Sequence, residues 1–210
     1  MRAFVHRRGV YVAEMDATER AILAGVVADT AALLGEPVQV ESAPAAEDDE
    51  TGEHDETSEQ ESHPGLAWSE EDLAEPDDPA LARLLPAASD DDEVSAEFRR
   101  LTQAELRDAK AQRLRIVWAA LRAPGTKLTV QPDQAMDWAA ALTDVRLVVS
   151  ERLGIRTDED AQAVYAATAA ATGENLSKED EVRLAMASVY SALTWLQESL
   201  VQVMLPSLED

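Results

Sequence analysis

The chain has 210 residues, and its lack of cysteine excludes disulfides, thiolate catalysis and metal centres held by cysteine. Its formal net charge is −24, but 16 acidic residues and no Lys or Arg lie between Glu41 and Asp78, which leaves −8 for the rest. No apolar run reaches the roughly 18 residues that a membrane helix needs, and the sequence turns basic at Arg7, where a signal peptide would turn apolar. We therefore expect a cytoplasmic protein with no membrane association.

The N-terminal segment predicts a β-hairpin followed by a helix. Short apolar runs at Ala3–His6 and Val10–Ala13 flank a turn in which Gly9 tolerates positive φ. Asp16, with a glutamate three residues later, has the pattern of a capping box. Gly35 is typical of the residue that follows a helix, so we expect one helix between these two positions.

An acidic insert follows, from residue 41 to about residue 77. It is rich in Glu, Asp, Ser, Thr and Pro, with few aliphatic side chains and a single tryptophan, Trp68. Such a segment cannot bury enough apolar surface to offset the entropy lost on ordering. We predict that the insert is disordered and that it interrupts a single domain that spans residues 1–210.

Three helices are predicted in the middle of the chain. Asp78-Pro79 is a cap followed by a first-turn proline, which indicates a short helix over Ala80–Leu85. A second short helix with an acidic start is expected over Asp90–Arg100. Thr102, with a glutamate three residues later, has the pattern of another capping box and predicts a separate helix to about Arg122.

The C-terminal part predicts one strand and three helices. Leu128–Val130, near residues 127–131, predicts a strand that joins the N-terminal hairpin. Caps at helix starts and glycine or proline at helix ends predict helices over about 132–153, 157–173 and 177–205. The predicted fold is therefore mainly α: a helical bundle with a small antiparallel β-sheet.

The last predicted helix carries a heptad pattern of apolar residues, which is typical of a coiled-coil seam. The seam would allow the chain to form a homodimer. The helix is also apolar around most of its circumference, which is typical of a helix buried in its own domain. We favour burial and keep homodimerisation as the alternative. The seam positions are Val182, Met186, Val189, Leu193, Leu196, Leu200 and Val203.

The sequence has no recognisable active site or metal site. The three histidines, His6, His54 and His63, lie at no tight ligand spacing, and there is no glycine-rich phosphate loop. No serine lies in a nucleophile elbow, and the acidic insert lacks the alternating ligands of a calcium loop. We therefore predict a protein that is not an enzyme and that uses no cofactor and no metal.

The region 99–127 is basic and is the candidate partner-binding surface. It holds eight Lys and Arg residues against two acidic ones. Such a surface would bind an acidic protein or, less favoured, the phosphate backbone of nucleic acid. The commoner explanation is a solvated helix face with snorkelling side chains. The candidate residues are Arg99, Arg100, Arg107, Lys110 and Arg113.

A structural role for two of these arginines is the other hypothesis. Arg99 and Arg100 end one predicted helix and Arg107 lies early in the next, so a tight turn at Leu101-Thr102 would bring them together. One of the pair would then clamp the acidic helix start at Asp90–Glu93 and fix how two helices meet. We favour this clamp for at least one of Arg99 and Arg100.

The element Phe98-Arg99-Arg100-Leu101-Thr102 is fairly specific, and it belongs to a larger set of segments at residues 78–86, 96–102, 106–110, 138–147 and 152–155. These segments, together with the opening hairpin and helix, resemble an actinobacterial domain-of-unknown-function family that includes oxidative-stress regulator (AosR-like) proteins. The similarity covers nearly the whole chain except the acidic insert.

The resemblance implies a non-enzymatic regulator that acts through protein–protein interaction, in transcription or the oxidative-stress response. Where relatives have a proposed redox role, it relies on a cysteine pair near the N-terminus. This chain reads Val5-His6-Arg7-Arg8-Gly9 there, so it has no cysteine redox switch of its own. The alternatives are a DNA-binding regulator that uses residues 99–127 and a ligand-binding protein whose pocket leaves no sequence motif.

Overall fold

The computed structural model describes residues 1–38, 76–170 and 177–208. The predicted disorder of residues 41–77 concerns a segment that lies, apart from its last two residues, outside this described part. The elements follow one another as β1 (Arg2–Arg7), β2 (Val10–Glu14), α1 (Ala17–Leu33), α3 (Pro79–Leu84), α4 (Asp92–Arg122), β3 (Lys127–Val130), the short 3-10 helix η1 (Pro132–Gln134), α5 (Ala135–Leu153), α6 (Asp158–Ala170) and α7 (Lys178–Leu208).

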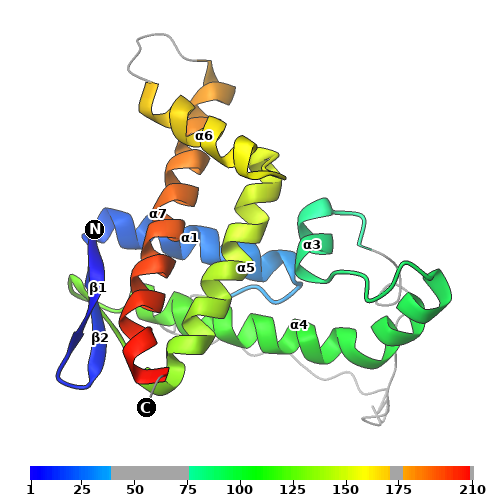
Figure 1. The fold of residues 1–210 in the computed structure, drawn as a ribbon, viewed down its shortest axis with the longest axis horizontal. Helices are drawn as coiled ribbons and strands as arrows, with labels where there is room; N and C mark the ends of the chain where they lie inside the picture. The colour runs from blue at the N-terminus through cyan, green and yellow to red at the C-terminus, as the bar shows by residue number, and fades with distance from the viewer. Residues whose placement is uncertain (39–75, 171–176, 209–210) are drawn as a thin grey trace, which may run out of the picture.

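Two antiparallel pairs of helices lie across each other in the fold (Figure 1). α1 runs beside α4, and α5 runs beside α7. α3 packs against α5, α6 packs against α7, and the three strands lie at one end, where α7 covers β1. The prediction of a mainly α fold with a small antiparallel sheet is therefore confirmed.

The sheet has the strand order β1-β2-β3, and both pairs are antiparallel. Arg8 and Gly9 form the hairpin turn with φ angles of 53° and 82°. Positive φ at both central residues is the requirement of the turn that suits the twist of a tight hairpin. At the edge of the sheet, the Phe4 N–H donates to the Ser199 hydroxyl of α7 at 3.1 Å, so the last helix is bound to the first strand.

α1 begins after Asp16 and ends before Gly35, as predicted from the sequence. The Asp16 side chain accepts a hydrogen bond from the Glu19 N–H, and the Glu19 carboxylate accepts one from the Asp16 N–H, both at 2.9 Å. The predicted capping box is therefore confirmed. Gly35 follows the helix with φ +80°, and a Cβ placed there would lie 3.4 Å from a guanidinium nitrogen of Arg107. Any larger residue at this position would be strained.

The prediction of two separate helices between residues 90 and 122 is wrong. α4 is one continuous helix of 31 residues, about 46 Å long at 1.5 Å per residue. Thr102 caps nothing, because its hydroxyl donates to the Phe98 carbonyl of the preceding turn at 2.9 Å. The helix contains no glycine and no proline, so nothing interrupts it, and the tight turn expected at this position does not exist.

A buried arginine of α1 closes the C-terminal end of α4. The last carbonyls of a helix have no partner within the helix itself. Arg20, only 4% exposed, supplies donors to this end and to the loop beyond it. Its guanidinium donates to four backbone carbonyls, those of Ala120 (2.5 Å), Leu121 (2.9 Å), Ala123 (2.7 Å) and Lys127 (3.2 Å).

The C-terminal helices follow the predicted caps, with one difference. Gly154 ends α5 in the left-handed region with φ 74°. The Ser177 hydroxyl accepts from the Asp180 N–H at 3.1 Å at the start of α7, as predicted. The predicted end of α6 at Gly173 lies outside the described residues. The predicted stop of α7 before Pro206 is wrong, because the helix continues to Leu208 with Pro206 in its final turn, where few hydrogen bonds remain for a proline to disturb.

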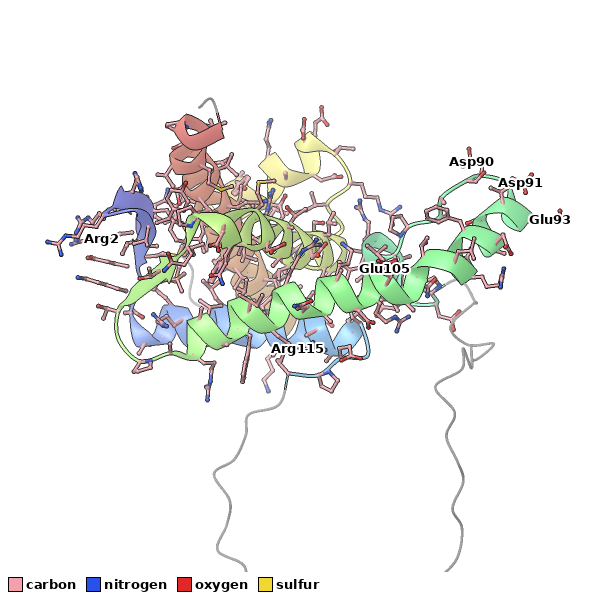
Figure 2. The ribbon with its side chains drawn as sticks, turned by 90° about the horizontal axis from the view of Figure 1, so that it is seen from below. Arg2, Asp90, Asp91, Glu93, Glu105 and Arg115 are labelled. Atoms are coloured by element: carbon pink, nitrogen blue, oxygen red, sulfur yellow. The ribbon has the colours of Figure 1, made fainter. Side chains whose placement is uncertain are left out.

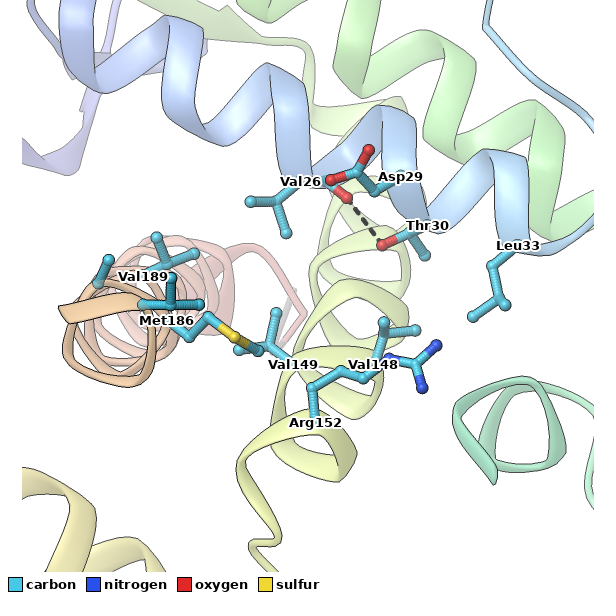
Figure 3. A pocket seen from close by; sticks show the side chains of 11 residues that line it. Val26, Asp29, Thr30, Leu33, Val148, Val149, Arg152, Met186 and Val189 are labelled. Atoms are coloured by element: carbon cyan, nitrogen blue, oxygen red, sulfur yellow. Dashed lines mark hydrogen bonds between the residues drawn. The ribbon is translucent and has the colours of Figure 1, made fainter. Parts of the chain in front are cut away.

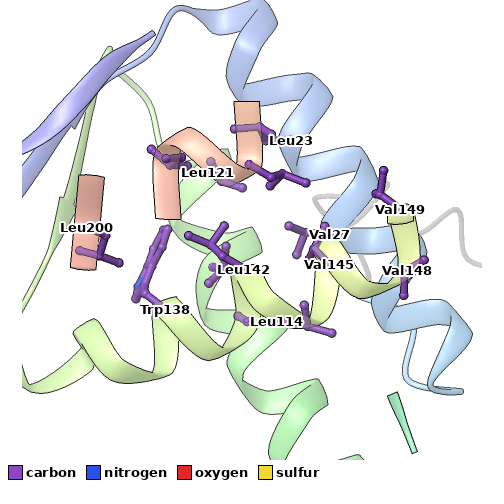
Figure 4. Close-up of a cluster of buried hydrophobic side chains, with 14 of the residues drawn as sticks. Leu23, Val27, Leu114, Leu121, Trp138, Leu142, Val145, Val148, Val149 and Leu200 are labelled. Atoms are coloured by element: carbon purple, nitrogen blue, oxygen red, sulfur yellow. The ribbon is translucent and has the colours of Figure 1, made fainter. Parts of the chain in front are cut away.

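The hydrophobic core lies where the two helix pairs cross. Trp138 and Leu142 of α5, Leu121 of α4 and Leu200 of α7 belong to one cluster of buried side chains (Figure 4). Buried residues of the three strands and of all six described α-helices belong to this one core. The core therefore fixes the position of α4, whose C-terminal half is part of it.

The centre of the heptad seam on α7 is buried within the chain. Leu193, Leu196 and Leu200 are at most 1% exposed, whereas Val182 is 60% exposed. The central leucines are thus taken up by intramolecular packing, as we favoured. Homodimerisation through this helix stays a prediction, and it would depend on the exposed N-terminal part of the seam.

Truncation of Leu196 to alanine is expected to lower the free energy of unfolding by about 3 kcal/mol, because it leaves a cavity in a packed core. Urea unfolding followed by circular dichroism measures the change. Leu205→Ala on the same helix is the control, since Leu205 is 51% exposed, and it should stay within about 0.5 kcal/mol of the parent. A Leu196 variant of parental stability that turns from dimer to monomer in light scattering would contradict the expectation.

Candidate functional site

Three of the five predicted partner-binding residues contact neighbouring helices of the same chain. Arg107 donates to the backbone carbonyl of Leu34 at the end of α1, at 3.0 Å. Arg113 donates to Asp137 of α5 at 3.0 Å, and the ammonium group of Lys110 also binds a carboxylate of α5. Residues three positions apart share one face of a helix. This face of α4 therefore contacts α1 and α5 and is not a free cationic surface.

The ion pair between Lys110 and Asp144 is buried. The two side chains are 15% and 4% exposed, and Lys110 Nζ donates to Asp144 Oδ1. The other carboxylate oxygen of Asp144 has no hydrogen-bond partner among the residues that the structure describes. Burial raises the pKa of the Asp144 carboxyl, and the charges of Lys110 and Arg113 oppose that shift. The pair therefore joins α4 to α5 in a site where an unpaired charge would be costly.

Arg99 and Arg100 lie on the N-terminal part of α4. Arg100 makes two hydrogen bonds to Glu97 of the same helix, at 3.0 and 2.7 Å, and Arg99 donates to Ser95 at 3.2 Å. The clamp that we favoured needed a helix junction, and the continuous α4 provides none. The inter-helix clamps are formed instead by the arginines further along α4.

An exposed apolar row, not predicted from the sequence, lies on the same helix. The N-terminal part of α4 extends beyond the packed helices, with Glu93 near its free end and Glu105 where it rejoins them (Figure 2); we call residues 92–105 the arm. Val94, Phe98 and Leu101 are 55%, 52% and 59% exposed. Steps of four and three residues place them on one face. Three large apolar side chains on adjacent turns are typical of an interaction surface rather than of scattered surface residues.

The surroundings of this apolar row are acidic. Figure 2 shows the acidic side chains at the free end of α4, and Glu105 continues the same solvent-facing side of the helix. Arg100 is paired with Glu97, so these two charges cancel each other. Asp92 and Glu93 also lie in the first turn of the helix, where the helix dipole stabilises them. The other exposed carboxylates around the row are those of Asp90, Asp91, Asp92, Glu93 and Glu105.

The described ranges contain neither a candidate metal site nor a helix that could span a membrane. No group of three or more His, Cys, Asp or Glu side chains with suitable positions for a metal ion occurs within residues 1–38, 76–170 and 177–208. His6 packs against the Tyr11 ring with a centroid distance of 5.5 Å, and His54 and His63 lie outside the described residues. None of the described helices has the length and apolar character needed to cross a bilayer.

The similarity of the chain to known families supports one assignment. The sequence profile described as "Domain of unknown function (DUF2017)" matches residues 1–204. The chain belongs to the DUF2017 family. The DUF2017 match spans the sheet, the arm and both helix pairs as far as residue 204 of α7. No curated protein and no solved structure gives a significant match to the chain.

Proposed function

We propose that this DUF2017 member is a non-enzymatic regulatory protein that acts by binding another protein through the arm of α4. The observation that carries this proposal is the row of Val94, Phe98 and Leu101, exposed on a helix that extends from the rest of the fold. The resemblance to actinobacterial oxidative-stress regulators supports transcription or the oxidative-stress response as the regulated process.

The chemistry of the arm favours a basic, amphipathic partner segment. The apolar row would pack against the apolar face of that segment, and burial of each large side chain contributes roughly 1.5–3 kcal/mol. The carboxylates beside the row would pair with Lys and Arg of the partner and set its orientation. This reverses the charge expected from the sequence, because the basic side chains that suggested an acidic partner are largely occupied within the chain.

Direct DNA binding has less support than protein binding. Lys110 is buried against Asp144, and Arg113 and Arg115 pair with Asp137 and Glu36. A phosphate backbone requires unpaired cations, whereas the solvent-facing side of the arm carries carboxylates that would repel it.

A double substitution in the arm tests the proposal. Phe98→Ser with Leu101→Ser is expected to weaken binding of a basic amphipathic helical peptide of Leu and Lys at least about tenfold, which corresponds to 1.4 kcal/mol. Fluorescence anisotropy of the labelled peptide measures the affinity. The same variant should lose the proteins that the parent chain retains from a native-cell extract, as seen by mass spectrometry. Its melting should be nearly unchanged, since both side chains are exposed in the free protein.

Ile22→Ser is the matched control, because Ile22 is 50% exposed on α1, away from the arm. It should bind the peptide as the parent does. Equal loss of binding in the control, or full binding by the arm variant, would overturn the proposal. Preference for an acidic peptide of the same length would restore the basic surface as the better candidate.

A further inference from the structure

A cavity of about 480 Å³ lies between α1, α5 and the N-terminal half of α7. Figure 3 shows side chains of all three helices facing the same space, with Val148 and Val149 below α1 and Met186 extending from α7. The volume lies within the range of small-molecule sites in proteins. The cavity is formed by elements other than the arm, so it is independent of the proposed partner surface. Its lining residues are Val26, Asp29, Thr30, Leu33, Val148, Val149, Arg152, Val182, Ala185, Met186 and Val189.

The walls of this cavity are apolar and held in place by the core. Val148 and Val149 are 9% and 4% exposed and belong to the hydrophobic core. β-branched side chains have few rotamers, so this wall keeps its shape without a ligand. Water in such a space would find few hydrogen-bond partners. The cavity therefore suits the apolar body of a small molecule.

The accessible polar group without a partner at the mouth of the cavity is an acceptor. Thr30 is 0% exposed and donates its hydroxyl proton to the Val26 carbonyl at 2.9 Å, so it offers a ligand no donor. The Asp29 carboxylate beside it (Figure 3) is exposed and has no hydrogen-bond or ion-pair partner among the described residues. A carboxylate accepts hydrogen bonds and donates none.

Arg152 at the mouth already has a counter-charge. It donates to the Asp78 carboxylate at 2.6 Å. The bond from Arg152 also holds the pKa of Asp78 below its usual range. An anionic ligand would share the guanidinium with the Asp78 carboxylate and would be repelled by the charges of Asp78 and Asp29.

From this arrangement we infer that the cavity binds a small, largely apolar molecule whose polar end is a hydrogen-bond donor, either an alcohol or an amine. The apolar body fills the space between the valines, and the hydroxyl or ammonium group donates to Asp29 at the mouth. The two head groups share this chemistry, and binding experiments distinguish them.

Three probes with the same eight-carbon chain test the inference: 1-octanol, octylammonium and octanoate. Isothermal titration calorimetry and methyl NMR shifts of the cavity valines measure binding to the full chain. We expect saturable binding of octanol and octylammonium, and binding of octanoate weaker by about tenfold or more. Asp29→Asn should weaken octylammonium about tenfold while octanol changes little, because only the ammonium loses a counter-charge.

Two variants with the same new side chain locate the binding site. Ala185→Phe on α7 adds a ring to the cavity wall, whereas Ser188→Phe adds it on the same helix outside the lining. Both positions are exposed, so both variants should fold. Ala185→Phe should abolish binding, and Ser188→Phe should preserve it. Equal effects of the two variants, octanoate binding as tightly as octanol, or no saturable binding of any probe would each overturn the inference.

Discussion

Replacement of Arg20 by methionine is expected to lower the free energy of unfolding by about 3–5 kcal/mol. The guanidinium donates to four carbonyls at the end of α4 and in the loop that leads to β3. Methionine keeps much of the apolar stem but donates to none of them, and each buried acceptor left unpaired costs about 1–3 kcal/mol. Guanidinium chloride unfolding measures the loss.

Arg20→Lys should fall between the parent and the methionine variant, since one ammonium group cannot reach the acceptors that a planar fork reaches. Arg7→Met is the control for loss of an arginine charge, because Arg7 is exposed on β1, and it should change stability by less than about 0.5 kcal/mol. A loss below about 1 kcal/mol for Arg20→Met would mean that water replaces the guanidinium at these carbonyls.

Lys110→Met is expected to cost about 3–5 kcal/mol at neutral pH, because it leaves the buried Asp144 carboxylate without its counter-charge. Adding Asp144→Asn should recover a large part of this loss, since the second substitution removes the uncompensated charge. A double-mutant cycle by chemical denaturation gives the coupling energy. If the double variant is no more stable than Lys110→Met alone, the penalty is one of packing rather than of charge.

The stability that Lys110→Met loses relative to the parent should also change with pH in a definite direction. Burial raises the folded-state pKa of Asp144 above its unfolded value, so the folded chain binds the proton more tightly. The contribution of this group to stability therefore falls as the pH rises from the unfolded pKa through the folded pKa. Lys110→Met removes a charge that opposes the shift, so its loss of stability relative to the parent should be smaller in mild acid than at neutral pH.

The helix ends could be predicted because their chemistry is local. Asp16 and Ser177 each lie three residues before an acid, and the same short-range hydrogen bonds that define the pattern cap α1 and α7 in the structure. Gly35 and Gly154 have the positive φ for which glycine at a helix end is favoured. The third strand could also be placed, because its apolar alternation matches the hairpin it joins.

The arm and the interhelical contacts could not be predicted, because they depend on long-range packing. Thr102 fits a capping pattern, yet a threonine inside a helix satisfies its hydroxyl on the preceding turn, and only the absence of glycine and proline hinted at continuity. Lys110 and Arg100 look alike in sequence. The first pairs with a carboxylate 34 residues away and the second with one in its own helix, so their roles follow from the position of α5 and not from neighbouring residues.

During ribosomal synthesis, β1 is complete long before the helix that covers it. Phe4 and its partner Ser199 are 195 residues apart, which is roughly 10–40 s of elongation at about 5–20 residues per second. For that time the outer edge of β1 is open to pairing with another nascent chain. Arg2 and Arg7 on the strand and Arg8 in its turn are exposed, and charged side chains on an edge strand discourage such pairing. We therefore expect these arginines to disfavour association of the growing chain until α7 emerges.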